Sequence, residues 1–111
     1  MALKKSLRLK KKKDIQKVKQ EGNIIHTPLF SVLYLDNQKK GPKFGFVVSK
    51  KIDKIAVKRN KVRRRLAEAV RSLLPKLKKD IYVLVLAKQS VKKADFEQIN
   101  EIFLKIKPIF R

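Results

Sequence analysis

The sequence predicts an α+β domain in which helices pack on a mixed sheet of four strands, in the order αβββαβα. Three observations support this prediction. The chain has 111 residues, enough for one hydrophobic core. Runs of β-branched and aromatic residues alternate with segments whose apolar residues recur at helical spacing. Hydrophobic residues make up 43% of the chain, which excludes a wholly disordered basic polypeptide. We therefore expect residues 1–111 to form a single domain.

The N-terminal half is expected to contain a basic segment, a helix and three strands. Residues 1–13 are rich in lysine and are expected to be mobile. A short helix is expected over residues 14–21, followed by a short strand within residues 23–28. Two longer runs, residues 28–36 and 42–51, are rich in β-branched and aromatic residues and are expected to pair as an antiparallel hairpin.

The C-terminal half is expected to contain two helices around a buried strand. The first helix covers residues 57–74 and ends at Pro75, which cannot continue it. The run IYVLVLA, residues 81–87, is almost continuously apolar, as is typical of a strand covered on both faces. The last helix begins at Asp95, which stands at capping-box spacing from Gln98. It is expected to reach Pro108 and to pack one face on the sheet through Phe96, Ile99, Phe103 and Ile106.

The charge of the chain predicts a polyanionic partner. Its 31 Lys and Arg residues against 9 Asp and Glu give a net charge of +22, which destabilises a compact state by self-repulsion. Nucleic acid or an acidic membrane surface would offset this charge. No run of about 18 apolar residues and no secretory signal is present, so we expect a cytoplasmic protein without a membrane span.

The helix over residues 57–74 concentrates this charge on one face. Its apolar stripe comprises Val62, Leu66, Ala69, Val70 and Leu73. On the opposite side and its flanks lies a basic ridge, formed by Asn60, Lys61, Arg63, Arg64 and Arg71. Arg59 borders the apolar stripe. Only Glu68 is acidic between residues 55 and 70, whereas a solvated helix face normally mixes both signs. Because arginine binds phosphate bidentately, the basic ridge favours contact with nucleic acid.

The same residues resemble a known family. The segment AVKRNKVRRRL, preceded by VVSKK, is similar to the signature of the protein subunit of bacterial ribonuclease P. RLKKKKDIQKVKQEG, SVLYL and IYVLVLAK resemble further parts of that family in the same order, so the resemblance covers nearly the whole chain. It implies the rarer left-handed crossover between parallel strands.

The resemblance also implies a division of labour. A large catalytic RNA with Mg²⁺ cleaves precursor tRNA, while the protein binds that RNA, holds the single-stranded 5′ leader and raises substrate affinity. No membrane and no obligate protein partner is implied, and no metal is expected on the protein alone. The implied RNA-binding residues are Ser49, Lys50, Lys51, Arg59, Asn60, Lys61, Arg63, Arg64 and Arg71. The implied leader-binding residues, in a groove between the first helix and the sheet, are Ile15, Val18, Phe30, Val32 and Tyr34.

Three positions depart from the family pattern. Ala67 stands where members usually carry another arginine, and the helical wheel places it on the outward side. Ile15 and Lys19 stand where aromatic residues are frequent, which reduces the stacking that the first helix offers. For Phe30, Val32 and Tyr34 two interpretations remain: a stacking surface for bases, worth roughly 1–3 kcal/mol per base, or a core covered by the first helix.

Catalysis by the protein itself is not expected. Its nine acids are scattered, and His26 is the only histidine and has no partner nearby in the sequence. The enzymatic activity, an endoribonuclease reaction, is therefore assigned to the ribonucleoprotein, with no catalytic residue in this chain. The alternative function is a ribosomal protein or general RNA chaperone without a role in tRNA processing. DNA-architectural and lipid-surface roles are less favoured, because no apolar wedge is evident and the helix buries its apolar stripe.

Overall fold

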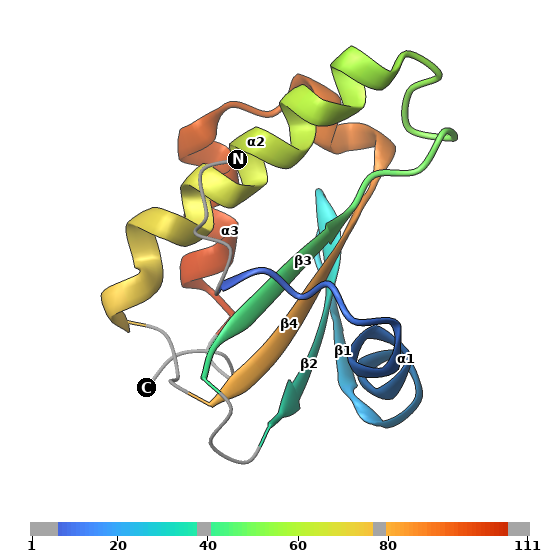
Figure 1. Ribbon diagram of the computed structural model, residues 1–111. Helices are drawn as coiled ribbons and strands as arrows, with labels where there is room; N and C mark the ends of the chain where they lie inside the picture. Colours follow the sequence, from blue (N-terminus) through green and yellow to red (C-terminus); the bar gives the residue numbers. More distant parts are fainter. Residues whose placement is uncertain (1–6, 38–40, 77–79, 107–111) are drawn as a thin grey trace.

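The computed structural model describes residues 7–37, 41–76 and 80–106. The elements follow the expected order, with two short 3₁₀ segments added. They are α1 (Lys12–Glu21), β1 (Asn23–His26), β2 (Phe30–Asp36), β3 (Lys43–Val47), α2 (Ala56–Leu73), η2 (Leu74–Lys76), β4 (Ile81–Ala87), η3 (Gln89–Lys93) and α3 (Phe96–Leu104). The mixed four-stranded sheet is confirmed, with the strand order β1-β2-β4-β3 (Figure 1).

The strand order corrects the expected hairpin between β2 and β3. These two strands do not pair, because β4 lies between them, antiparallel to β2 and parallel to β3. The hairpin is formed instead by β1 and β2. β4 is the most continuously apolar strand, so the central position, where both of its faces are covered, buries the most apolar surface.

Helices cover the two faces of the sheet in separate layers (Figure 1). The larger core lies under α2 and α3, and includes Phe30 of β2, whose ring lies 4.6 Å from that of Phe103 in α3. The smaller core lies under α1, where Val18 packs with Leu33 and Leu84. Partners across the strands share a face, so alternate residues of β2 and β4 belong to the two cores.

The N-terminal segment is more ordered than its composition predicts. Leu9 is 5% exposed in the smaller core, its N–H donates to the carbonyl of Phe44 at 2.8 Å, and Arg8 forms a parallel bridge with the same residue. Lys12 and Lys13 already belong to α1. The expected mobility is therefore wrong from Leu7 onward, while residues 1–6 lie outside the described part of the chain.

The turn after α1 depends on a glycine for space and not for backbone conformation. Gly22 has φ −74°, which any residue adopts. A side chain there would bring its Cβ within 2.9 Å of the carbonyl oxygen of Tyr34 and closer still to that of Val18. The absence of a side chain thus lets α1 turn directly into β1.

Two further boundaries differ from the sequence expectation. β3 ends at Val47, and the chain then turns through residues 49–51, where the carbonyl of Ser49 accepts the N–H of Ile52 at 3.0 Å. α3 ends at Leu104, although Ile106 is still buried, and Pro108 lies outside the described residues. The capping box between Asp95 and Gln98 is confirmed.

Candidate nucleic-acid interface

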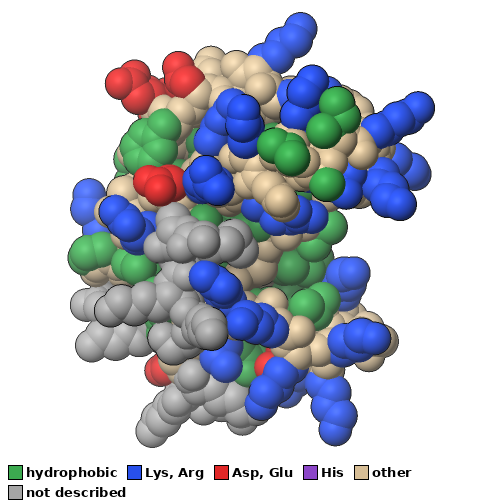
Figure 2. Space-filling model, turned by 45° about the horizontal axis from the view of Figure 1, so that its top comes forward, with side chains coloured by type: hydrophobic (Ala, Val, Ile, Leu, Met, Phe, Trp, Pro, Cys, Tyr) green, Lys and Arg blue, Asp and Glu red, His purple; other side chains and the backbone are tan. Residues whose placement is uncertain are grey.

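The basic ridge of α2 faces solvent, as its sequence predicts. Asn60, Lys61, Arg64 and Arg71 are exposed and Arg63 is half-buried, while Val62, Leu66, Ala69, Val70 and Leu73 are buried in the larger core. Lys and Arg side chains dominate much of the face shown in Figure 2, where acidic side chains are sparse. This helix therefore holds its cations on a fixed scaffold.

Two arginines at the ridge are held in place by backbone and amide oxygens. Arg63 Nη1 donates to the Asn60 side-chain oxygen at 2.6 Å, and its Nη2 lies 3.5 Å from the carbonyl oxygen of Val48. Arg59 Nη1 donates to the carbonyls of Asp53 and Lys54 at 3.0 and 2.9 Å. Arg59 is half-buried beside the apolar stripe that it borders in the sequence, and both guanidinium groups keep further N–H donors for a ligand.

In the part of the chain that the structure describes, no member of the basic ridge forms an ion pair with an acid. The ion pair nearest to the ridge in sequence joins Lys92 Nζ to Asp53 at 3.3 Å and leaves the ridge cations unpaired with carboxylates there. Burial of these guanidinium groups without a partner would be costly, but at a solvent-facing helix they stay hydrated until a polyanion replaces the water. This arrangement suits a phosphate backbone.

The predicted residues Ser49, Lys50 and Lys51 lie in the exposed turn that precedes α2. The turn is close to the basic ridge, since Arg63 reaches the carbonyl of Val48. The Gln89 amide donates to the carbonyl of Lys51 and ties the turn to η3. The structure thus brings the turn and the ridge together.

The predicted leader-binding residues do not form one surface. Phe30 and Val32 are fully buried under α2 and α3, on the face of the sheet opposite α1, and half-buried Tyr34 packs against the same core. Val18 of α1 is also fully buried. Neither of the two interpretations of the β2 residues was right, since α2 and α3 cover them. Of the five residues, only Ile15, which belongs to α1 itself, lies at the border of the smaller core and is also partly exposed.

The other face of the sheet offers different apolar side chains beside α1. Val47 of β3 and Ile24 of β1 are 39% and 49% exposed, and Leu86 of β4 is half-buried. The hydroxyl of Tyr82 in β4 interacts with the carboxylate of Asp14 in α1. Burial first, and then this interaction with Asp14, raise the pKa of Tyr82. The interaction links α1 to the sheet.

The position of Ala67 differs from the outward side that the helical wheel predicted. It is fully buried in the larger core, not on the outward side of α2. α2 packs against both α3 and β3, so its buried face is wider than the apolar stripe alone suggests. Alanine at this position therefore serves the packing of α2 in the larger core.

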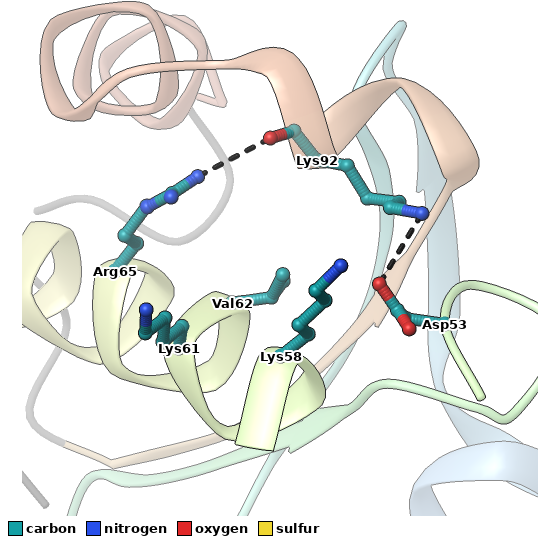
Figure 3. Close-up of a pocket in the computed structure, with 6 residues that line it drawn as sticks. All are labelled: Asp53, Lys58, Lys61, Val62, Arg65 and Lys92. Carbon is teal, nitrogen blue, oxygen red and sulfur yellow. Dashed lines mark hydrogen bonds and ion pairs between the residues drawn. The ribbon is translucent and has the colours of Figure 1, made fainter. Parts of the chain in front are cut away.

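A depression of about 210 Å³ beside α2 contains basic residues that the sequence analysis did not assign. Lys58 and Arg65 project from α2 toward Lys92 of η3, next to Asp53 (Figure 3). A hydrogen bond from the Ile55 N–H, at 2.9 Å, is the main cause that lowers the pKa of Asp53. The ion pair with Lys92 lowers this pKa further. Lys58 and Arg65 share one flank of the helical wheel, but no sequence signal links Lys92 to that flank.

The described residues contain neither a metal-ligand cluster nor a membrane-spanning helix. No group of three or more His, Cys, Asp or Glu side chains is placed to hold a metal ion in residues 7–37, 41–76 or 80–106. The Nδ1 atom of His26 lies 2.9 Å from the hydroxyl of Ser31, so this histidine does have a hydrogen-bond partner. None of the helices in the same ranges is long and apolar enough to cross a membrane.

Comparisons with known proteins agree with this geometry. The family model for ribonuclease P matches residues 3–107. A ribonuclease P protein component of Dictyoglomus turgidum is 36% identical over 101 residues, covering 89% of this chain and 84% of the relative. One from Streptococcus pneumoniae is 30% identical over 112 residues, covering 98% and 90%.

Solved structures show the same fold. The ribonuclease P protein of Staphylococcus aureus superposes with a TM-score of 0.83 at 29% identity, over 95% of this chain and 98% of that one. The protein of Thermotoga maritima gives 0.80 at 25% identity, over 89% and 93%. The chain therefore belongs to the ribonuclease P protein family, the protein components of the ribonucleoprotein that processes the 5′ ends of tRNA.

Proposed function

We propose that this chain binds the catalytic RNA of ribonuclease P through the basic ridge of α2 and the turn at residues 49–51. The observation that carries the proposal is a solvent-facing helix surface whose cations no acid of the described chain neutralises. Asn60, Arg64 and Arg71 follow the helix axis over about 16 Å, at 1.5 Å per residue, which spans several phosphates of a folded RNA. Arginine adds bidentate hydrogen bonds to the charge attraction.

Hydrolysis of the precursor is assigned to the RNA with Mg²⁺. The basic ridge consists of guanidinium, ammonium and amide groups, which donate hydrogen bonds to phosphate but do not take protons as general bases at neutral pH. Their contribution is to bind and position RNA in the cytoplasm. The chain itself supplies no step of bond cleavage in this proposal.

The single-stranded 5′ leader of precursor tRNA is the second proposed ligand, on the α1 side of the sheet. Support comes from the exposed Val47 and Ile24, together with half-buried Ile15 and Leu86, at the border of the smaller core. Phe30, Val32 and Val18 have no part in this surface, since they are buried. Apolar contacts of this kind tolerate any base sequence, as a leader of variable sequence requires.

The experiment for the first contact measures binding of the catalytic RNA alone. Arg64→Glu should weaken binding at least tenfold at low salt, because it removes one phosphate contact and adds a repulsion. The control is Lys19→Glu, which makes the same charge change on exposed α1, on the opposite layer. It should change binding less than threefold. Equal losses of affinity in both variants would show that RNA binding depends only on the net charge of the protein. That result would refute a specific contact between the basic ridge and the RNA.

The experiment for the second contact uses the reconstituted holoenzyme at low Mg²⁺ with precursors that carry a long or a short leader. Val47→Glu should remove the affinity gain that the long leader gives and leave the short precursor unchanged. Leu104→Glu is the control, since Leu104 of α3 is 43% exposed, against 39% for Val47. A leader-dependent gain that survives Val47→Glu would contradict the assignment of this face.

A further inference from the structure

A second basic surface lies between α2 and the segment that joins β4 to α3. The depression of about 210 Å³ next to Lys92 adjoins another of about 440 Å³, which extends along α2 to Phe96 of α3. Lys61 and Arg65 line both depressions, so the two form one continuous groove, which we call the α2–α3 groove. Figure 3 shows the part of this groove beside Lys92, on the flank of α2 that faces η3.

The walls of the α2–α3 groove are tied together. Arg65 Nη1 donates to the carbonyls of Lys92 and Ala94 at 3.4 and 3.2 Å, which joins α2 to the start of α3. The Lys92 ammonium pairs with Asp53 at 3.3 Å. These contacts join the walls of the groove, so the protein would lose little conformational entropy when a ligand binds there.

The charge of the α2–α3 groove favours an anion with more than one phosphate. Five cations line it against two carboxylates, those of Asp53 and Glu68. Asp53 already has a cationic partner, so its charge does not oppose a ligand strongly. The depression beside Lys92 is smaller than the roughly 300 Å³ at which sites for whole small molecules begin, and suits a phosphate group. The depression beside Phe96 lies within that range.

Phe96 gives the α2–α3 groove an aromatic platform. Its side chain is 41% exposed, although helical spacing assigns it to the same face as the buried Ile99 and Phe103. Within residues 7–37, 41–76 and 80–106, it is the one aromatic among the exposed large hydrophobic residues. The capping box of Asp95 with Gln98, at 2.9 and 3.0 Å, fixes the first turn of α3 that carries this ring. A fixed, exposed ring beside cations is the combination that stacks unpaired bases.

We propose that the α2–α3 groove binds an unpaired nucleotide of RNA, with the base stacked on Phe96 and the flanking phosphates held by Lys61, Arg65 and Lys58. This inference rests on the proposed function, that the chain binds RNA, and adds a contact on a different flank of α2 from Arg63. An anionic ligand without a base would use the cations and leave Phe96 in water. A paired RNA would bring phosphates but no free base face to the ring.

The test measures the affinity of the full chain for a labelled single-stranded oligoribonucleotide and for a fully paired, blunt-ended RNA duplex over a range of salt. Phe96→Ala should weaken binding of the single strand about tenfold or more, with the salt dependence unchanged, and leave binding of the duplex unaffected. Lys58→Gln should lower the slope of log affinity against log salt by about 0.7, the value for one phosphate of a single strand. Phe96→Trp should retain the affinity, because a larger ring still stacks.

The control is Leu104→Ala, a truncation on the same helix at similar exposure, 43%. It should bind both probes as the unchanged protein does. Separate measurements with the catalytic RNA and with precursor tRNA show which of the two supplies the nucleotide, since only that one loses affinity in Phe96→Ala. Thermal unfolding of each variant confirms that the ring is lost without loss of the fold.

Three outcomes overturn the inference. They are unchanged single-strand binding in Phe96→Ala, an equal loss for the paired duplex, and no retention of affinity in Phe96→Trp. If Arg71→Glu, at a residue of the basic ridge that does not line the α2–α3 groove, weakens binding of the catalytic RNA while Phe96→Ala has no effect on any RNA, the proposed function stands and only the groove is excluded. If neither variant changes binding, the proposed function fails as well.

Discussion

The interaction of the Tyr82 hydroxyl with Asp14 is removed in Tyr82→Phe, which lacks only that hydroxyl. Tyr82 is 3% exposed on β4, and Asp14 lies in the first turn of α1, so this interaction joins the helix to the centre of the sheet. Phenylalanine keeps the ring and its packing against Val18 and Leu84 in the smaller core. The variant therefore isolates the contribution of the hydroxyl.

The size of the effect follows from the charge of the acceptor. A hydrogen bond to a charged group contributes about 1.5–3 kcal/mol, and the half-buried Asp14 is partly rehydrated when the bond is lost, so we expect about 1.5 kcal/mol. The entropy of unfolding for 111 residues is about 0.23 kcal/mol per kelvin at the midpoint. The melting temperature should therefore fall by about 6 °C at pH 7.

The pH dependence gives an independent check with a definite sign. The pKa of Tyr82 is raised above its ordinary value of 10.0, first by burial and then by Asp14. Above that value the unfolded chain releases the tyrosine proton while the folded chain retains it, so the free energy of unfolding falls as the pH rises. Phenylalanine has no such proton. The stability difference between the two proteins should thus shrink from pH 8 to pH 11.

The assay is thermal and urea unfolding followed by circular dichroism at pH 7, 8 and 11. Tyr34→Phe is the control, because it removes a hydroxyl from a half-buried tyrosine on the other face of the same sheet. A control that loses as much stability as Tyr82→Phe would refute a specific bond to Asp14. So would a stability difference that stays constant up to pH 11.

Three further variants test other contacts. Gly22→Ala should lower the free energy of unfolding by about 1–3 kcal/mol in urea, because its Cβ would press on the carbonyl of Val18, whereas relief by a small backbone shift would leave it unchanged. Ala67→Arg should destabilise the fold by a similar amount and give no gain in RNA affinity, because the position is buried; a tighter complex would show that it faces RNA. Asp53→Asn should reduce the loss of stability that the protein shows below pH 4. The pKa of Asp53 is lowered from its ordinary value of 3.8, mainly by the Ile55 N–H, so the ionised carboxylate stabilises the fold above pH 3.8 and this stabilisation is lost as acid protonates the group. Identical acid unfolding curves would exclude that contribution.

Local chemistry made the elements and the basic ridge predictable. The helix over residues 57–74 was recognised because its apolar residues recur at a fixed spacing, and it spans Ala56–Leu73 in the structure. The start of α3 was recognised from two side chains three residues apart, whose capping box is present. The strand at residues 81–87 was assigned correctly because a short, almost continuously apolar run is typical of a strand covered on both faces. Each signal depends on neighbours in sequence.

Tertiary contacts decided what the sequence left open. A strand that is apolar on both faces, such as β2, is covered twice, and nothing in its own residues tells which helix covers Phe30 and which covers Leu33. The pairing of β4 with both β2 and β3 likewise depends on competition between strands far apart in the chain. The positions of Ala67 and Phe96 depend on how α2 and α3 meet, and a helical wheel carries no information on that contact.

The bridge between Arg8 and Phe44 has a consequence for how the molecule avoids self-association. A parallel edge strand with free N–H and C=O groups recruits strands from other copies. Here Arg8 and Leu9 occupy part of the outer side of β3, and the opposite edge of the sheet is β1, only four residues long. A truncation that removes residues 1–10 would uncover the outer edge of β3, and aggregation at high concentration would be its first sign.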